Sequence, residues 1–95
     1  MAAYMIVQIE VTDPEGFAEY REKVGPQIAK HGGRYIVQGA EVENLEGEWD
    51  PGRLAIFEFP TVDDIHRFYD AEEYQPLLAL RMRTANTVLS IVEGV

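Results

Sequence analysis

The sequence predicts an α+β fold in which helices cover one face of a four-stranded antiparallel sheet, in the ferredoxin-like order β-α-β-β-α-β. Four segments have the alternation or the β-branched and aromatic content of strands, at residues 4–11, 34–38, 53–60 and 87–93. Apolar residues at helical spacing lie between the first and second segments and between the third and fourth. In this order, one helix joins the first strand to the second, and another helix joins the third strand to the fourth.

The first strand and the first helix have the clearest patterns. Residues 4–11 alternate so that four apolar side chains share one face, namely Met5, Val7, Ile9 and Val11. Asp13 and Pro14 predict a helix start, because Asp13 can accept the free amide hydrogens of the first turn and proline loses nothing there. The helix then carries an apolar stripe of Phe17, Tyr20, Val24 and Ile28. Gly25-Pro26 predicts a kink or a break, and His31-Gly32-Gly33 predicts the helix end.

The second half of the chain contains a polar segment and two helical segments. Residues 41–46 predict a short, polar extension of the second strand or a hairpin arm. Thr61 precedes an acid by three residues and predicts the cap of a helix. Residues 72–83 predict a further helix, and Pro76 suits its first turn.

Helices can cover only one face of such a sheet, so the composition of the other face predicts what lies against it. That face carries four apolar or aromatic residues and three polar ones: Tyr4, Ile6, Leu54 and Ile56 with Gln8, Glu10 and Glu58. An apolar patch of this kind marks an interaction site, and a symmetric dimer needs only one self-complementary patch. The sequence therefore predicts a homodimer through the sheet face. The alternative is a monomer whose segment 41–52 folds over the sheet.

Composition narrows the classes of partner and cofactor. The 95 residues make one domain, residues 1–95, and a formal net charge of −9 disfavours binding to nucleic acid or to anionic membranes. The chain has no cysteine, which excludes thiol nucleophiles and thiolate metal sites. No apolar run approaches the ~20 residues of a membrane span, and residues 1–4 lack the features of a signal peptide. We expect a cytoplasmic protein without metal or organic cofactor.

Motifs along nearly the whole chain resemble the domain of unknown function 1330 family. They are Gly32-Gly33-Arg34-Tyr35, Leu45-Glu46-Gly47-Glu48-Trp49, Arg53 followed by Glu58-Phe59-Pro60, Tyr69-Asp70, Glu73-Tyr74, Arg81 and Glu93-Gly94. The resemblance implies the dimeric α+β barrel superfamily, whose two sheets associate across a dyad. Relatives by fold include cofactor-independent monooxygenases, muconolactone isomerases and stress-responsive barrel proteins. Fold does not transfer chemistry, and none of their catalytic residues maps onto this chain.

Glu58 is the candidate catalytic residue. It lies on the mixed face of the third strand among aliphatic neighbours, where packing alone favours leucine. A carboxylate removed from water in this way is a candidate general base or ligand-binding group. The alternative is a structural ion pair with Arg34, Arg53 or Arg81.

Six further residues are candidate ligand-binding groups: Tyr4, Arg34, Trp49, Arg53, Tyr69 and Arg81. Arg34 can hold a carboxylate bidentately or cap the preceding helix. Trp49 lies in a Gly/Asp/Pro turn, where it can cover a pocket or dock into a partner subunit. Docking is the favoured interpretation, since tryptophan is enriched at interface cores. Arg81 shares a helical stripe with Tyr74, which favours an ion-pairing role over a substrate role.

The function predicted from these residues is the binding of a small organic molecule in a partly apolar cavity near the sheet face. One alternative is a cofactor-independent enzyme, similar to an isomerase or a monooxygenase, in which Glu58 transfers a proton. Another is a structural or interaction module without a ligand. An enclosed volume that reaches Glu58 favours the enzyme, and an arginine clamp on Glu58 with no void favours the module.

Overall fold

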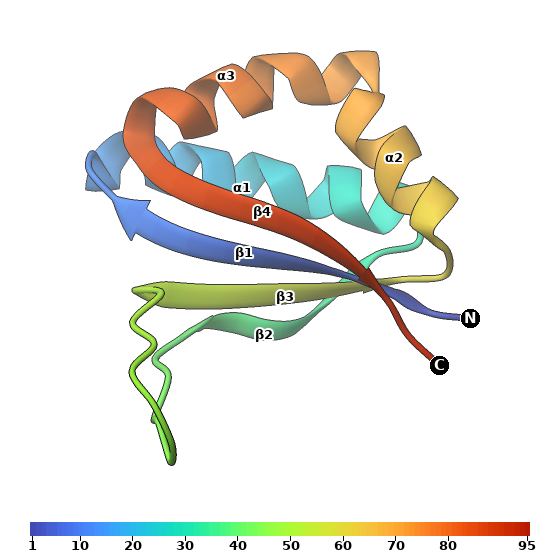
Figure 1. Ribbon diagram of the computed structural model, residues 1–95. Helices are drawn as coiled ribbons and strands as arrows, with labels where there is room; N and C mark the ends of the chain where they lie inside the picture. Colours follow the sequence, from blue (N-terminus) through green and yellow to red (C-terminus); the bar gives the residue numbers. More distant parts are fainter.

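All 95 residues are described in the computed structural model, in which the helices lie on one face of a four-stranded antiparallel sheet (Figure 1). The elements in chain order are β1 Ala3–Val11, α1 Pro14–Lys30, β2 Arg34–Ala40, β3 Arg53–Phe59, α2 Val62–Asp70, the 3₁₀ turn η1 Glu72–Tyr74, α3 Gln75–Thr84 and β4 Ala85–Glu93. The strand order is β2-β3-β1-β4, which places β1 and β3 in the centre. The predicted fold class is confirmed.

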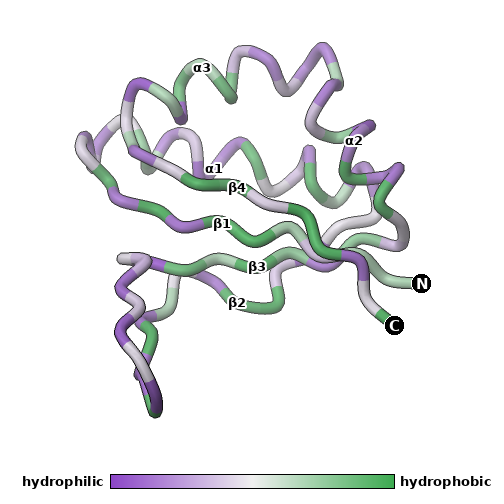
Figure 2. Tube along the Cα trace, in the orientation of Figure 1, coloured by the Kyte–Doolittle hydropathy of each residue, from purple (hydrophilic) through white to green (hydrophobic).

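The predicted division of the sheet into two faces is also confirmed. Met5 on β1 pairs with Phe57 on β3, and both side chains are buried beneath the helices. Tyr4 and Glu58, one residue away on the same strands, pair with each other and are partly exposed. Figure 2 shows hydrophilic and hydrophobic residues alternating toward the C-terminal end of β1. We refer to the side of the sheet without helices as the open face.

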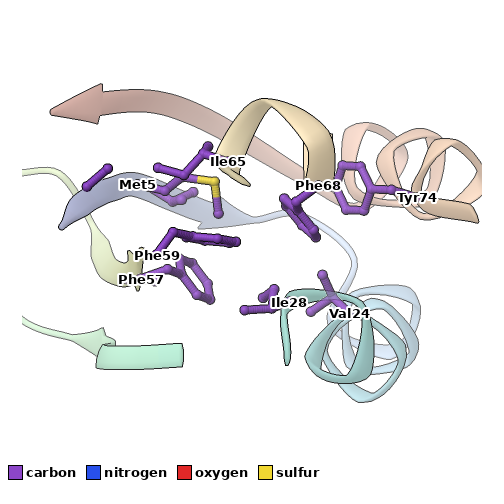
Figure 3. Close-up of a cluster of buried hydrophobic side chains, with 11 residues drawn as sticks. Met5, Val24, Ile28, Phe57, Phe59, Ile65, Phe68 and Tyr74 are labelled. Atoms are coloured by element: carbon purple, nitrogen blue, oxygen red, sulfur yellow. The ribbon is translucent and has the colours of Figure 1, made fainter. Parts of the chain in front are cut away.

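The core lies between the sheet and the helices. Figure 3 shows the side chains that meet there, with Met5, Phe57 and Phe59 from the sheet, Val24 and Ile28 from α1, Ile65 and Phe68 from α2, and Tyr74. The ring of Phe68 lies 4.4 Å from that of Tyr74 and 5.7 Å from that of Phe59, measured between centroids. Each such side chain contributes about 1.5–3 kcal/mol when fully buried, so the helices are held to the sheet chiefly by this cluster.

The helix caps agree with the sequence, whereas the break in α1 does not occur. Asp13 accepts the amide of Gly16 at 3.3 Å, and Thr61 accepts the amide of Asp64 at 3.1 Å. The helix continues through Pro26, so the chain does not break there, and a kink at Gly25-Pro26 stays a prediction. Val24 and Ile28 lie on either side of this proline and are both buried, and their burial offsets the hydrogen bond that proline cannot donate.

The segment between β2 and β3 contains no strand, so the predicted strand extension or hairpin arm at residues 41–46 is wrong. Residues 41–52 form an irregular loop that projects from the sheet on the side away from the helices (Figure 1). Two large apolar residues of the loop are exposed, with 90% of Leu45 and 46% of Trp49 accessible to solvent. The loop does not lie across the open face. A segment this rich in acids and glycine gains too little from burial to pack there.

The last helical segment begins one turn later than predicted. Residues 72–74 form the 3₁₀ turn, and α3 follows with Pro76 in its first turn, as the sequence predicted. None of the helices combines the length and the apolar composition that a bilayer crossing requires.

Candidate functional site

A cavity of about 420 Å³ lies between the sheet and the helices. Eleven of its 16 lining residues are hydrophobic, and they come from all four strands and from α1. Its charged lining residues are three arginines, Arg21, Arg53 and Arg81, and no acidic residue lines it. The cavity is therefore apolar over most of its wall and positively charged at three points.

A larger and more open cleft of about 850 Å³ adjoins the cavity. The two share five lining residues, namely Ile9, Val11, Phe17, Arg21 and Arg53. The cleft adds three acids that do not line the cavity: Glu10, Glu41 and Asp50. We refer to this cleft as the mouth of the cavity, since the shared residues place it at the entrance.

Arg81 is the most unusual group in the cavity. It lies on α3, only 4% of its surface is exposed, and its Nη1 donates to Thr87 Oγ1 on β4. Its Nε is buried without a hydrogen-bond partner, and no carboxylate lies within ion-pair distance. The predicted ion-pairing role is therefore wrong, because the helical stripe that turns Arg81 inward brings it to a hydroxyl and to a void. A buried charge without a counter-charge is costly, and most buried charges are paired.

The unpaired cations of the chain gather in this cavity. The chain has eight basic residues, and four of them form ion pairs with acids: Lys23, Lys30, Arg34 and Arg67. Of the four remaining arginines, three line the cavity, and Arg83 does not. With 17 acidic residues in the chain, partners for these arginines are abundant, so their common location indicates a site for an anion.

Arg21 and Arg53 are held at the mouth by neighbouring groups. The Arg21 guanidinium lies 5.5 Å from the centre of the Phe17 ring, a cation–π distance. Arg53 Nη1 donates to the carbonyl of Gly39 at 3.2 Å. Gly39 has φ 66° and lies where the pairing of β2 with β3 shifts register, as in a β-bulge. Glycine adopts this backbone conformation readily, and the irregularity brings the Gly39 carbonyl within reach of Arg53.

Half-buried phenols line the cavity next to the arginines. The hydroxyls of Tyr20 and Tyr74 lie 2.8 Å apart. Burial raises the pKa of Tyr20 far above its ordinary value of 10.0, the neighbouring Tyr74 raises it further, and the charge of Arg81 opposes the change. Burial also raises the pKa of Tyr35, against an opposing effect of Arg21. Both phenols that line the cavity, Tyr20 and Tyr35, are therefore neutral hydrogen-bond donors at physiological pH.

Glu58 lies on the open face and does not line the cavity. Its Oε1 accepts from Arg34 Nε at 3.0 Å and lies 2.9 Å from Arg34 Nη2, and its Oε2 accepts from the Tyr4 hydroxyl at 3.4 Å. The side chains of Arg34 and Glu58 are 70% and 29% exposed. The ion pair with Arg34, one of the two alternatives for Glu58, is present.

The predicted site residues occupy separate places. Tyr4, Arg34 and Glu58 are together on the open face, and Trp49 is in the projecting loop. Tyr69 on α2 does not line the cavity and lines a separate pocket of about 500 Å³ between α2 and β4. Only two of the predicted residues meet in the cavity, Arg53 and Arg81.

The candidate residues chosen from the sequence did not include the other polar groups of the cavity, which are Arg21, Gln38 and the hydroxyls of Tyr20 and Tyr35. A signal for Arg21 was present, because it follows Phe17 by four residues and so lies on the same side of the helix. The helical stripe also contained Tyr20, which was assigned to the core. Nothing in the local pattern distinguished a core phenol from one that faces a void.

A family model described as Domain of unknown function (DUF1330) matches residues 2–95. Among solved structures, a protein of unknown function from Rhodopseudomonas palustris aligns with a TM-score of 0.78 and 19% identity, over 99% of this chain and 82% of that one. SnoaB, a cofactor-independent oxygenase from Streptomyces nogalater, aligns with a TM-score of 0.69 and 10% identity, over 99% and 93%. A dimeric ferredoxin-like protein of unknown function from Jannaschia sp. CCS1 aligns with a TM-score of 0.62 and 11% identity, over 99% and 100%. At these identities the likeness is one of fold, and no curated protein matches the chain.

Proposed function

The chain belongs to the DUF1330 family, and from that premise we propose that it binds a small organic anion in the cavity between the sheet and the helices. The observation that carries the proposal is Arg81, a buried guanidinium with an unpartnered Nε and no acid beside it. An isolated buried charge costs several kcal/mol. A carboxylate that enters the cavity supplies the missing counter-charge and accepts hydrogen bonds in a geometry that guanidinium groups favour.

The size and the walls of the cavity support an organic ligand. Its volume of about 420 Å³ falls within the ~300–1,000 Å³ of small-molecule sites, which are mostly apolar with a few placed polar groups. Aromatic walls from Tyr20, Tyr35 and Phe57 can contact an aromatic or aliphatic body. The phenol hydroxyls can donate to the anionic end of the ligand.

The test is isothermal titration calorimetry with a panel of small carboxylates, including benzoate, phenylacetate and hexanoate. Arg81→Gln is the test variant, and Arg83→Gln is its matched control, because Arg83 is on the same helix but does not line the cavity. A charged hydrogen bond contributes about 1.5–3 kcal/mol, so we expect Arg81→Gln to weaken binding about 10- to 100-fold. Arg83→Gln should bind like the unaltered protein. Failure of every carboxylate to bind the unaltered protein, or equal binding by Arg81→Gln, would contradict the proposal.

A second candidate function is catalysis without a cofactor. The fold shared with SnoaB favours it, as do the neutral phenols beside Arg81, which can hydrogen-bond to charge that develops on a bound molecule. Proton transfer by Glu58 remains a prediction. Because Glu58 is on the open face, this role requires a reacting group on that face, against a second subunit. Conversion of a bound probe, followed by NMR, supports this candidate if Glu58→Gln or Tyr20→Phe slows the conversion without weakening binding.

A second copy of the chain is the partner that we propose for the open face. Apolar side chains of the open face are exposed to solvent, with 43% of Ile36, 57% of Val88 and 48% of Val92 accessible. The loop at residues 41–52 projects away from the helices (Figure 1), and we propose that its exposed Trp49 docks against the second copy. The related protein from Jannaschia is described as dimeric, and a self-complementary face needs only a two-fold axis.

A further inference from the structure

We infer that the ligand of the cavity carries two anionic groups, one at each side of an apolar body. The inference rests on the proposed function and adds the class of ligand to it. It starts from the charges of the lining, which are three arginines and no acid. A single anionic group needs one of these arginines, and the other two remain unpaired at the mouth.

The arginines form two separate groups of hydrogen-bond donors, which we refer to as the first and second seats. Both groups lie along one row of directly paired residues in the sheet. Thr87 on β4 pairs with Ile9 on β1, and Ile9 pairs with Arg53 on β3. Directly paired residues of antiparallel strands point to the same side, so Thr87 and Arg53 flank Ile9 on the side of the helices. Two strand spacings separate their Cα atoms, or about 10 Å.

The first seat is formed by Arg81 with Thr87. Arg81 Nη1 donates to the Thr87 hydroxyl, and this contact directs the guanidinium to the β4 side of the cavity. The unpartnered Nε gives this seat a free donor that is sealed from water. An anion bound here loses its own hydration, and a charged donor is needed to offset that loss.

The second seat is formed by Arg53 with Arg21 at the β3 side. Arg53 is held by the Gly39 carbonyl and Arg21 by the ring of Phe17, and neither has an acidic partner. Both arginines are otherwise exposed, so they remain hydrated until a ligand arrives. Two guanidinium groups at one entrance provide the donors for a second carboxylate.

The acids of the mouth mark the outer limit of this positive region. Glu10, Glu41 and Asp50 line the mouth but not the cavity itself. Glu10 accepts from Asn86 Nδ2 at 2.9 Å, and Asp50 accepts from the amide of Gly52 at 3.3 Å, so two of the three are engaged within the chain. An anionic group left outside the arginines meets repulsion from these acids. The second group of the ligand is therefore drawn in as far as Arg53.

The test compares molecules that differ by one charge at nearly constant size. Terephthalate has two carboxylates on one ring, and its monomethyl ester has one. Adipate and monomethyl adipate repeat the comparison with a flexible spacing. Binding of all four is measured by calorimetry on the unaltered protein, on Arg53→Gln and on Arg34→Gln. Arg53 is exposed, so its replacement should not disturb folding, and Arg34 is the control because it lies on the open face of the same sheet.

We expect at least one diacid to bind about tenfold more tightly than its own monoester, the effect of one charged hydrogen bond. Arg53→Gln should reduce that diacid to the affinity of the monoester and leave the monoester within about twofold, while Arg34→Gln changes neither. The inference is overturned if both monoesters bind as tightly as their diacids, or if Arg53→Gln weakens monoester and diacid equally. In those cases monocarboxylate binding that depends on Arg81 still supports the proposed function, which fails separately if no carboxylate binds.

Discussion

The open face of the sheet carries a paired charge, whereas the helix face carries an unpaired one. On the open face, Glu58 and Arg34 neutralise each other within reach of solvent. On the helix face, Arg81 is nearly sealed from solvent and no acid neutralises it. A solvent-exposed ion pair such as that of Glu58 and Arg34 contributes little to stability. A buried charge without a partner, such as that of Arg81, lowers stability.

This difference is the basis of the proposed function. A chain with 17 acidic residues could place one beside Arg81, as it does beside Arg34. No such acid is present, so the charge of Arg81 is uncompensated within the chain. The sequence singled out Glu58 as the polar residue in an apolar setting, whereas the uncompensated group is on the other face.

The largest expected effect comes from comparing neighbouring residues on β3 that face opposite ways. Phe57 is 6% exposed on the helix face, and Ile56 lies on the open face. Phe57→Ala should lower the free energy of unfolding by about 3–5 kcal/mol through loss of buried area and creation of a cavity. Ile56→Ala should lower it by less, and by an amount that depends on protein concentration if the open face is an interface. Urea denaturation at two concentrations measures both, and equal losses would remove the distinction between the faces.

An acidic substitution on the open face tests whether a second copy of the chain binds there. Analytical ultracentrifugation of the unaltered protein at tens of micromolar should give twice the chain mass of 10.8 kDa. Ile56→Glu should sediment at the single mass, because two copies of the charge face each other across a two-fold axis. An unaltered protein that is monomeric at this concentration would rule out the shared interface.

Alkaline pH should destabilise the helix face through its buried phenols. The raised pKa of Tyr20 favours its neutral form in the folded chain. This contribution is complete below the unfolded pKa of about 10 and is lost as pH rises above it, at up to about 1.4 kcal/mol per pH unit. The free energy of unfolding should therefore fall between pH 9 and pH 11, and less steeply in Tyr20→Phe. Parallel pH profiles for the two proteins would count against a buried neutral phenol.

The smallest expected change in stability comes from a substitution on the open face. Glu58→Gln should change the free energy of unfolding by less than about 1 kcal/mol, since its ion pair with Arg34 is accessible to solvent. Arg34→Gln serves as the matched replacement of the other partner. Loss of the fold in Glu58→Gln, seen by circular dichroism, would instead make the pair an essential structural element.

Local pattern was sufficient for most of the fold. The alternation around Met5 and Phe57 assigned the faces of the sheet correctly, and Asp13 and Thr61 cap helices as predicted. These features depend on neighbours in sequence or on period alone. The helix does not break at Pro26 because the burial of Val24 and Ile28 in the core outweighs a local preference.

The site was less predictable because its geometry depends on where long side chains end. The stripe on α3 indicated that Arg81 points inward, but the partner of its guanidinium is set by the packing of α3 against β4. The void itself is a difference between the volume enclosed and the volume filled, and no local pattern encodes that difference. Arg53 was considered as an ion-pair partner of Glu58, but its pairing with Ile9 places it on the helix face, where its Nη1 donates to the Gly39 carbonyl.

The central claim is that Arg81 serves a ligand and not the fold, and urea denaturation of Arg81→Met, with and without a carboxylate that binds the unaltered protein, tests it most directly. Without the carboxylate, we expect the variant to be as stable as the unaltered protein or up to about 3 kcal/mol more stable, because methionine fills the site without a buried charge. With the carboxylate, only the unaltered protein should gain stability. A variant destabilised by about 3–5 kcal/mol and stabilised by the carboxylate as much as the unaltered protein would contradict the claim.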